Sequence, residues 1–576
     1  MAAARIAYFS MEIAFESSIP TYSGGLGVLA GDTLRSAADL GLPMVAVTLV
    51  HRKGYFRQRL DEKGNQTEDE APWQPEKVLE PADPIVSVPI EGRSVQVRAW
   101  RFAIEGVSGH VVPVHLLDTN LPDNSPWDQA LTDHLYGGDE HYRLCQEVVL
   151  GIGGVRMLQA LGYGELQSYH MNEGHSGLLA LGLLEQRLGK PDLRTATEAD
   201  IEAVRERCVF TTHTPVPAGH DQFPRSLMRQ VLGDQRADVL EVTRCCPDNA
   251  LNMTYLALRF SRYINGVAMH HGEISHDMYP NYPVRAITNG VHAVTWTSAA
   301  FCALYDRHIP EWRRDNHYLR YAVGIPLGEI AEAHRQAKWV LLEEVRKAAG
   351  TRLDARAITL GFARRAASYK RADLLFSNLD RLKWIATRAG PLQMVFAGKA
   401  HPRDEEGKRL IRRVFEAAQG LRGSIEIVYV QDYDMRWGQL ITSGVDVWLN
   451  TPHRPYEASG TSGMKAALNG VPSLSVPDGW WYEGHFEGVT GWDIGHEELV
   501  DDPAAEAASL YDKLELVILP MFYTRPNAFV EVMRSTIALN GAFFNAQRML
   551  SQYALNAYSP EATKTPHLAG AKASDS

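Results

Sequence analysis

Short, nearly continuous apolar runs rich in β-branched residues recur along this chain, and most of them lead through a loop into a helical segment. Such runs are typical of strands buried on both faces of a parallel sheet. The repeated order of strand, loop and helix therefore predicts an α/β fold with doubly wound sheets. The predicted strands are Ile6–Ser10, Met44–Val50, Gln167–Met171, Cys208–Thr212, Ala357–Phe362, Leu392–Ala397 and Glu426–Val430. The predicted helices are Val28–Leu40, Ser176–Leu188, Tyr369–Leu382, Glu405–Ala418 and Met435–Ser443.

A charged, helical stretch separates two groups of alternating strands and helices. Within this stretch, the sequence EIAEAHRQAKWVLLEEVRKAAG predicts one long amphipathic helix. We expect an N-terminal Rossmann-like domain over 1–295, a helical connection over 296–355 and a C-terminal Rossmann-like domain over 356–558. The segment Asp61–Trp100 predicts an antiparallel excursion in the first domain, and the Ala/Ser/Thr/Pro-rich tail 559–576 predicts disorder. Ligands of open α/β sheets bind beyond the carboxyl ends of the strands, so the site is expected in a central cleft between the domains.

Composition narrows the classes of function. The chain has 58 Lys and Arg against 69 Asp and Glu, a formal charge of -11, which disfavours broad nucleic-acid binding. Its five cysteines form no CxxC pair and no disulfide framework, which favours a reducing compartment. No secretory signal and no apolar run long enough to span a membrane is found, so the cytoplasm is the expected location.

The densest chemical signal is the segment EASGTSGMK, from Glu457 to Lys465, followed by AALNG. Gly460 and Gly463 allow backbone N–H groups to approach an anion, and the residues after Met464 predict a helix whose start favours negative charge. Hydroxyl donors are added by Ser459, Thr461 and Ser462. The segment is not a Walker A loop, and its composition alone also fits a plain connection between elements.

A second signal is a cluster of four cations directly after an apolar strand. The cluster contains Arg364, Arg365, Lys370 and Arg371, and paired arginines suit a bidentate oxyanion. Taken alone, the same residues fit a solvated helix start equally well.

Weaker signals follow other strands. They are the glycine loop Gly24–Gly27, the histidine-containing segments Asn172–His175 and Thr211–Pro215, and Asn289 in NGVHAVTW. His270, His271 and His276 lack HExxH spacing, so no metal site is predicted.

Together these segments resemble the α-glucan phosphorylases, the glycogen, starch and maltodextrin phosphorylases, from residue 6 to about residue 480. The resemblance implies two Rossmann-like domains of the GT-B glycosyltransferase type and the cofactor pyridoxal 5'-phosphate (PLP). EASGTSGMK is similar to the family's cofactor-lysine motif, so Lys465 would carry PLP as a Schiff base. Glu457 would bind hydroxyls of the glucosyl unit, and Ser459 to Gly463 would hold substrate phosphate and sugar.

Further roles carry over from the same resemblance. Arg365 would contact the substrate phosphate, and Arg364 and Lys370 would contact the cofactor phosphate or its surroundings. The remaining residues implied are Gly25 and Leu26 for the substrate phosphate, His213 and Asn289 for the glucosyl ring, and Tyr433 and Trp296 for the cofactor pocket. The implied reaction is phosphorolysis of terminal α-1,4-glucosidic bonds by inorganic phosphate, which releases α-glucose 1-phosphate with retention.

This chain departs from the family pattern at three positions. Arg364 stands where the family has Lys, Ala367 where it has His, and Gly463 where longer members have Asn. The chain resembles the shorter bacterial and archaeal branch and starts almost at its first strand, so we expect neither a phosphorylatable N-terminal tail nor allosteric control. The resemblance to this family also implies a homodimer.

Two other functions remain as alternatives. A glycosyltransferase resembling glycogen synthase, using a nucleotide sugar, would carry a second Glu where this chain has Lys465. A non-catalytic glucan-binding protein would not need the lysine, glutamate, arginines and histidine together.

Overall fold

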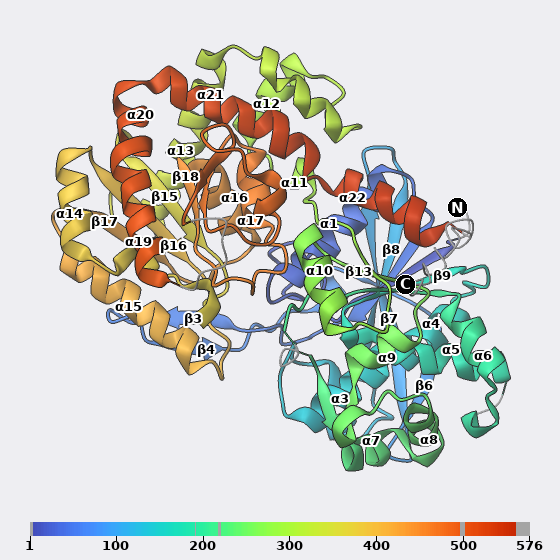
Figure 1. Ribbon diagram of the computed structural model, residues 1–576. Coiled ribbons are helices and arrows are strands. Elements are labelled where there is room, and N and C mark those ends of the chain that lie inside the picture. Colours follow the sequence, from blue (N-terminus) through green and yellow to red (C-terminus); the bar gives the residue numbers. More distant parts are fainter. Residues whose placement is uncertain (1–3, 190–191, 217–219, 496–501, 560–576) are drawn as a thin grey trace, which may run out of the picture.

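The computed structural model describes residues 4–189, 192–216, 220–495 and 502–559, and it contains two large sheets flanked by helices (Figure 1). The first sheet has ten strands in the order β14-β13-β10-β9-β1-β2-β8-β7-β5, with β6 paired to β7. Its strands are β1 Ile6–Phe9, β2 Met44–Leu49, β5 Glu80–Pro81, β6 Val86–Ile90, β7 Arg93–Glu105, β8 Val111–Asp118, β9 Ser168–Asn172, β10 Cys208–Thr211, β13 Tyr263–Gly266 and β14 Val284–Ala286. The strands from β14 to β8 are parallel, and β5, β6 and β7 are antiparallel.

The second sheet has six parallel strands in the order β17-β16-β15-β18-β19-β20. They are β15 Ile358–Ala363, β16 Leu392–Ala397, β17 Glu426–Val430, β18 Val447–Asn450, β19 Ser473–Ser475 and β20 Gly491–Asp493. The α/β fold is confirmed, and every strand predicted from the sequence is present to within one residue at either end. In the described part of the chain, no helix combines the length and apolar character that crossing a bilayer requires.

The helices that flank these strands keep the predicted periodicity. The main ones are α1 Gly25–Asp39, α5 Leu179–Leu188, α13 Leu327–Ala349, α14 Leu379–Arg388, α15 Glu405–Leu421, α16 Met435–Gly444, α17 Ser462–Ala467 and α22 Ala546–Tyr553. Helix α13 is the predicted long amphipathic helix, with buried residues that include Ile330, Leu341 and Val345.

The predicted helix Tyr369–Leu382 is wrong. The chain instead forms two 3-10 turns, Ser368–Lys370 and Leu374–Phe376, before α14 begins. Arg371 has a positive φ of 46° that no α-helix tolerates, and Lys370 is drawn into a buried ion pair with Glu457. A distant partner therefore overrides the local helical pattern.

A hairpin, β3 Arg57–Leu60 and β4 Gln66–Asp69, leaves the first sheet and contacts the second half (Figure 1). It begins four residues before the predicted antiparallel excursion Asp61–Trp100. Gln58 Nε2 donates to Gly398 O at 2.8 Å, and Gln66 Nε2 donates to Ala400 O at 2.8 Å. The hairpin therefore fixes the loop after β16 to the first half.

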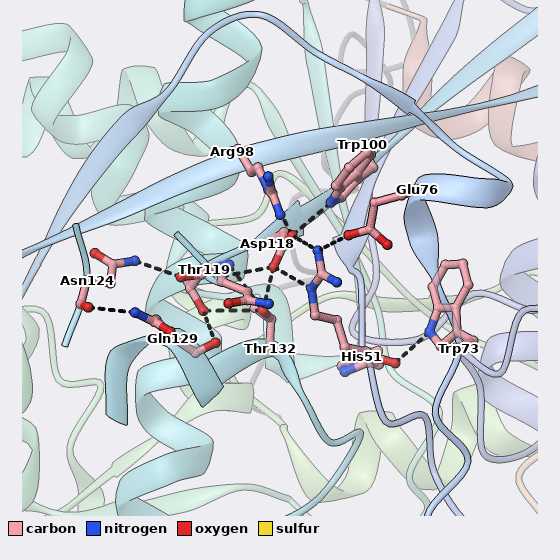
Figure 2. Close-up of polar contacts among 12 residues, drawn as sticks. His51, Trp73, Glu76, Arg98, Trp100, Asp118, Thr119, Asn124, Gln129 and Thr132 are labelled. Carbon is pink, nitrogen blue, oxygen red and sulfur yellow. Dashed lines mark hydrogen bonds and ion pairs between the residues drawn. The ribbon is translucent and has the colours of Figure 1, made fainter. Parts of the chain in front are cut away.

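A buried polar centre anchors the chain that leads to this hairpin. Figure 2 shows Asp118, the last residue of β8, between Arg98 and Trp100 of β7 on one side and Thr132 on the other. Asp118 accepts from Trp100 Nε1 at 2.8 Å and from Arg98 Nε at 2.9 Å. Arg52 Nη2, just before the hairpin, donates to the same carboxylate at 2.7 Å.

The last helix returns to the first sheet (Figure 1). Tyr553 Oη lies 3.0 Å from Thr211 Oγ1, and Tyr558 Oη lies 2.7 Å from His170 Nδ1. The division at 295 and 355 stays a prediction, to which this packing adds residues 546–558 beside the first sheet. Of the tail predicted to be disordered, 560–576 lies outside the described residues.

Candidate active site

A cluster of charges lies where β15 and β18 end. These strands are parallel neighbours, so Arg364, directly after β15, lies beside Asn450, the last residue of β18. Arg364 Nη2 donates to Glu457 Oε2 at 2.7 Å, and its Nη1 contacts Asn450 Oδ1. Lys370 Nζ forms an ion pair with the same oxygen of Glu457. The structure therefore brings Arg364, Lys370 and Glu457 into one buried set.

The charge state of Glu457 follows from these contacts. Burial alone would raise the pKa of its carboxyl, but Arg364 and Lys370 outweigh that effect and hold the pKa at about 2. Glu457 is thus ionised, and the two cations leave this cluster with a net charge of +1. An excess of positive charge at the end of a strand suits an anionic ligand.

A turn after β19 shapes the Glu457–Lys465 segment. The carboxylate of Asp478 accepts from Glu457 N and from Gly479 N, both at 2.9 Å, and Trp480 N donates to Ser459 O at 2.8 Å. Trp480 also explains Gly463, because a Cβ at that position would lie 2.7 Å from Trp480 Cζ2. The departure at residue 463 therefore has a local packing cause.

The polar residues of this segment have different surroundings. Gly460 has a φ of +72°, which favours glycine. Ser462 Oγ accepts from Trp448 Nε1 at 3.1 Å, and Thr461 is the residue before α17 but makes no side-chain capping bond. Ser459 is buried. The segment is thus a folded part of the strand ends rather than an exposed connection.

Lys465 lies in α17 with its amine buried. Its Nζ is 3.8 Å from the centroid of the Trp296 ring, and burial lowers the pKa of the amine to about 8. Asn469 Nδ2 donates to Trp296 O at 2.8 Å and to Lys465 O at 3.1 Å, so one amide ties the two residues together. Within the described residues, no hydrogen bond or ion pair joins this amine to the Glu457 cluster.

Tyr433 belongs to the same neighbourhood as Trp296. A Cβ at Gly438 would lie 3.0 Å from Tyr433 Oη and 3.4 Å from the Trp296 ring, so both aromatic side chains border one glycine of α16. Burial raises the pKa of Tyr433, which therefore stays a neutral hydrogen-bonding phenol.

The first sheet supplies the glycine loop after β1. Helix α1 begins at Gly25, so the N–H groups of Gly25 and Leu26 lie in its first turn, where they have no partner within the helix. Gly25 is exposed, and a Cβ there would meet no atom within 4 Å. Glu12 holds the loop in place by accepting from Ser23 N at 2.5 Å and Gly24 N at 3.2 Å.

His213 follows β10 and is half-buried. Its Nε2 lies 2.6 Å from Asn172 Oδ1, and its backbone N donates to Glu173 Oε2 at 2.8 Å. Burial lowers the pKa of the imidazole to about 4, so His213 is neutral. Asn289 is the third residue after β14. It is buried, and its Oδ1 has no hydrogen-bond partner among the described residues.

Arg365 connects the two halves electrostatically. Desolvation by the surrounding protein lowers the pKa of its guanidinium, but Tyr369, Tyr55 and Glu12 outweigh this effect and raise the pKa. Tyr55 and Glu12 come from the first half, whereas Arg365 follows β15 of the second. The side chain is nonetheless exposed, and it forms no ion pair with a carboxylate in the part of the chain that the structure describes.

Sequence reasoning missed four carboxylates. Glu12 anchors the glycine loop, Glu173 anchors the His213 segment, Asp478 anchors the Glu457 segment, and Asp32 lies beside Trp296. Glu173 lies in the histidine-containing segment Asn172–His175, and Asp478 precedes Gly479 three residues after the end of β19. The local sequence around Asp32 carries no signal, because its partner is 264 residues away.

The three histidines near residue 270 do not gather. His271 Nδ1 accepts from Val267 N at 3.1 Å, while His270 and His276 each lie near a carboxylate of their own helix. Across the described ranges, no group of three or more His, Cys, Asp or Glu is placed to hold a metal ion.

Comparisons with known proteins agree on one family. A family model described as carbohydrate phosphorylase matches residues 220–483. The maltodextrin phosphorylase of Thermococcus litoralis is 38% identical over 96% of this chain and 70% of its own length. The glycogen phosphorylase of Mycobacterium tuberculosis is 36% identical over 98% of this chain and 72% of its own, and that of Aquifex aeolicus is 34% identical over 96% and 86%. The chain belongs to the carbohydrate phosphorylase family.

Proposed function

We propose that this chain is an α-glucan phosphorylase. Inorganic phosphate cleaves the terminal α-1,4-glucosidic bond of glycogen, starch or maltodextrin, and α-glucose 1-phosphate is released with retention in a reversible reaction. The observation that carries the proposal is the buried Lys465 amine against Trp296, in a segment whose Glu457 is paired with two cations. A nucleotide-sugar enzyme would carry a carboxylate at position 465.

The residues around Lys465 fit pyridoxal 5'-phosphate. A lysine must be unprotonated to capture an aldehyde, and burial lowers the pKa of this amine to about 8. The flat Trp296 ring and the phenol of Tyr433 supply aromatic walls, and Arg364 and Lys370 supply positive charge for a phosphate. When bound, the group supplies a phosphate that exchanges a proton with the substrate phosphate.

The chain's own residues hold the substrates. Arg365 binds the phosphate through its exposed guanidinium, and the N–H groups of Gly25 and Leu26 donate to it from the start of α1. Two unit charges about 4 Å apart repel by about 4 kcal/mol at an effective dielectric of about 20. The net positive charge of the Glu457 cluster offsets repulsion of this size when two phosphates are held together.

The sugar is held by groups that contact hydroxyls. Glu457 accepts, neutral His213 donates or accepts, and the unpartnered Oδ1 of buried Asn289 accepts a hydroxyl. Loop residues Ser459 to Gly463 complete the contacts to sugar and phosphate. Because the acid is a phosphate, the paired carboxylates of a glycoside hydrolase are not needed.

The family resemblance also implies a homodimer that works in the cytoplasm with two domains facing a central cleft. Light scattering during size-exclusion chromatography tests the dimer.

The direct test is a product assay. The full chain is incubated with maltodextrin and inorganic phosphate, and glucose 1-phosphate is measured; UDP-glucose or ADP-glucose replaces phosphate in parallel reactions. We expect glucose 1-phosphate from the phosphate reaction. Transfer from a nucleotide sugar without phosphorolysis would support the glycogen synthase alternative, and no product from any donor would support a non-catalytic glucan-binding protein.

A further inference from the structure

A buried carboxylate lies next to the proposed cofactor lysine. Asp32 is in the middle of α1, one turn beyond the glycine loop, and its side chain is fully buried. Its Oδ2 accepts a hydrogen bond from Trp296 Nε1 at 2.8 Å. Its Oδ1 has no hydrogen-bond partner among the described residues. A buried carboxylate oxygen that accepts no hydrogen bond is costly, which indicates a role in the site.

Trp296 is held from two sides so that its ring lies under Lys465. Asp32 fixes the indole edge, and Asn469 fixes the backbone carbonyl at 2.8 Å. Lys465 Nζ is 3.8 Å from the ring centroid. Asp32, Trp296 and Lys465 therefore form one contiguous group assembled from the first half, the connecting segment and the second half of the chain.

The charges around the amine are few. Burial lowers the pKa of Lys465, and Asp32 opposes this by raising it. Arg35, on the next turn of α1, places Nη1 3.8 Å from Asp32 Oδ1, and Glu16 acts on Arg35 in turn. A carboxylate in a low-dielectric interior acts strongly on a nearby amine. Asp32 is therefore the charged group that acts most on Lys465.

We propose that Asp32 is a positioning residue for Lys465, whose carboxylate holds the Trp296 indole beneath the amine and adds a negative charge to the surroundings of the lysine nitrogen. The proposal rests on the proposed function for the purpose of this arrangement. Asp32 belongs to α1 and is far in sequence from the Glu457–Lys465 segment. An aldehyde-bound lysine nitrogen that carries a proton would keep the same counter-charge.

The test measures the titration of Lys465 itself. The full-length chain, freed of bound pyridoxal phosphate, is labelled briefly with acetic anhydride across a pH series, and mass spectrometry follows the peptide that contains Lys465. The wild-type midpoint is expected at about pH 8. Asp32→Asn keeps the shape of the side chain and removes its charge, so the midpoint should fall by about one pH unit or more.

A second variant moves the midpoint the other way. Arg35→Gln removes the cation beside Asp32, so the Asp32 carboxylate acts on the amine without that shielding and the midpoint should rise. Asp69→Asn is the control, since the Asp69 side chain is 55% exposed and pairs with Arg59 of its own hairpin. Its midpoint should equal that of the wild type.

The outcomes separate the two proposals. An unchanged midpoint in Asp32→Asn overturns the role of Asp32, and so does an unchanged midpoint in Arg35→Gln when Asp32→Asn does not fold. A wild-type chain that never takes up pyridoxal phosphate overturns the proposed function, whereas the labelling profile of the cofactor-free chain still decides the role of Asp32.

Discussion

Arg364 and Glu457 are 93 residues apart in the chain, yet Arg364 Nη2 lies 2.7 Å from Glu457 Oε2 in a buried ion pair. The pair joins the end of β15 to the segment that carries Lys465. Removing one partner of a buried ion pair leaves the other charge without compensation. The pair therefore links the fold of the site to its chemistry, and both can be tested with the same variants.

Replacing Glu457 with Gln should destabilise the chain by about 3–5 kcal/mol, because Arg364 and Lys370 would then be buried without a counter-charge. Thermal unfolding measures the loss. Arg364→Lys, which installs the residue of the family pattern, keeps the positive charge and should cost far less. Equal losses in the two variants would contradict a charge-based explanation.

Lys465→Ala should lose bound pyridoxal phosphate and all phosphorolysis. Borohydride reduction of the wild type should fix a pyridoxyl group on the peptide that contains Lys465, as detected by mass spectrometry. Lys347→Ala serves as the control, since Lys347 is exposed on α13 and, among the residues that the structure describes, forms an ion pair with Glu344 alone. The assignment is wrong if the Lys465 variant retains activity or if the label appears on another lysine.

Arg365→Ala should lower kcat/KM for phosphate. The expected loss of transition-state stabilisation is about 1.5–3 kcal/mol, the range for hydrogen bonds to charged groups. Steady-state kinetics at varied phosphate, with maltodextrin saturating, measure the effect. Arg356→Ala is the control, since the Arg356 side chain is 93% exposed and precedes β15, at the opposite end of that strand from Arg365. A phosphate dependence identical to that of the wild type would remove Arg365 from the phosphate site.

The sequence predicted correctly those features that depend on neighbouring residues in the chain, such as apolar strands and a continuous motif. β16 matches its predicted run, Leu392–Ala397, residue for residue, because five of its six residues are apolar and all six are buried. Lys465 was found because its motif is continuous in sequence.

The errors and omissions involve distant partners. The predicted helix Tyr369–Leu382 fails because Lys370 pairs with Glu457, 87 residues later. Asp32 and its partner Trp296 are 264 residues apart, so no spacing rule could have joined them. Asp478 reaches Glu457 across 21 residues and two elements. Residues that position a site through tertiary contacts leave no local signature.

Gly463→Ala should destabilise the chain by about 1–3 kcal/mol, because the added Cβ would lie 2.7 Å from Trp480 Cζ2. Thermal unfolding of Gly463→Ala, Trp480→Phe and the double variant forms a cycle. The smaller Phe ring should relieve the clash, so the double variant should lose less than the sum of the single losses. Gly328→Ala is the control, since a Cβ there meets no atom within 4 Å. Strict additivity would place the cause elsewhere.

Asp478→Asn should change how stability depends on pH. Burial raises the pKa of the Asp478 carboxyl to about 7, and the charge of Glu457 adds to the rise. In the unfolded chain this pKa is about 3.9, so the folded state binds more protons between these values. The Asp478 contribution to the free energy of unfolding therefore falls as pH rises from about 4 to about 7, by up to about 1.4 kcal/mol per pH unit.

Melting temperatures of the wild type and of Asp478→Asn across this pH range should show the wild type losing stability relative to the variant. Asp512→Asn, at a side chain that is 60% exposed, should run parallel to the wild type. If Asp478→Asn also runs parallel, the carboxyl is already ionised throughout this range, and the two backbone bonds from Glu457 and Gly479 outweigh its burial.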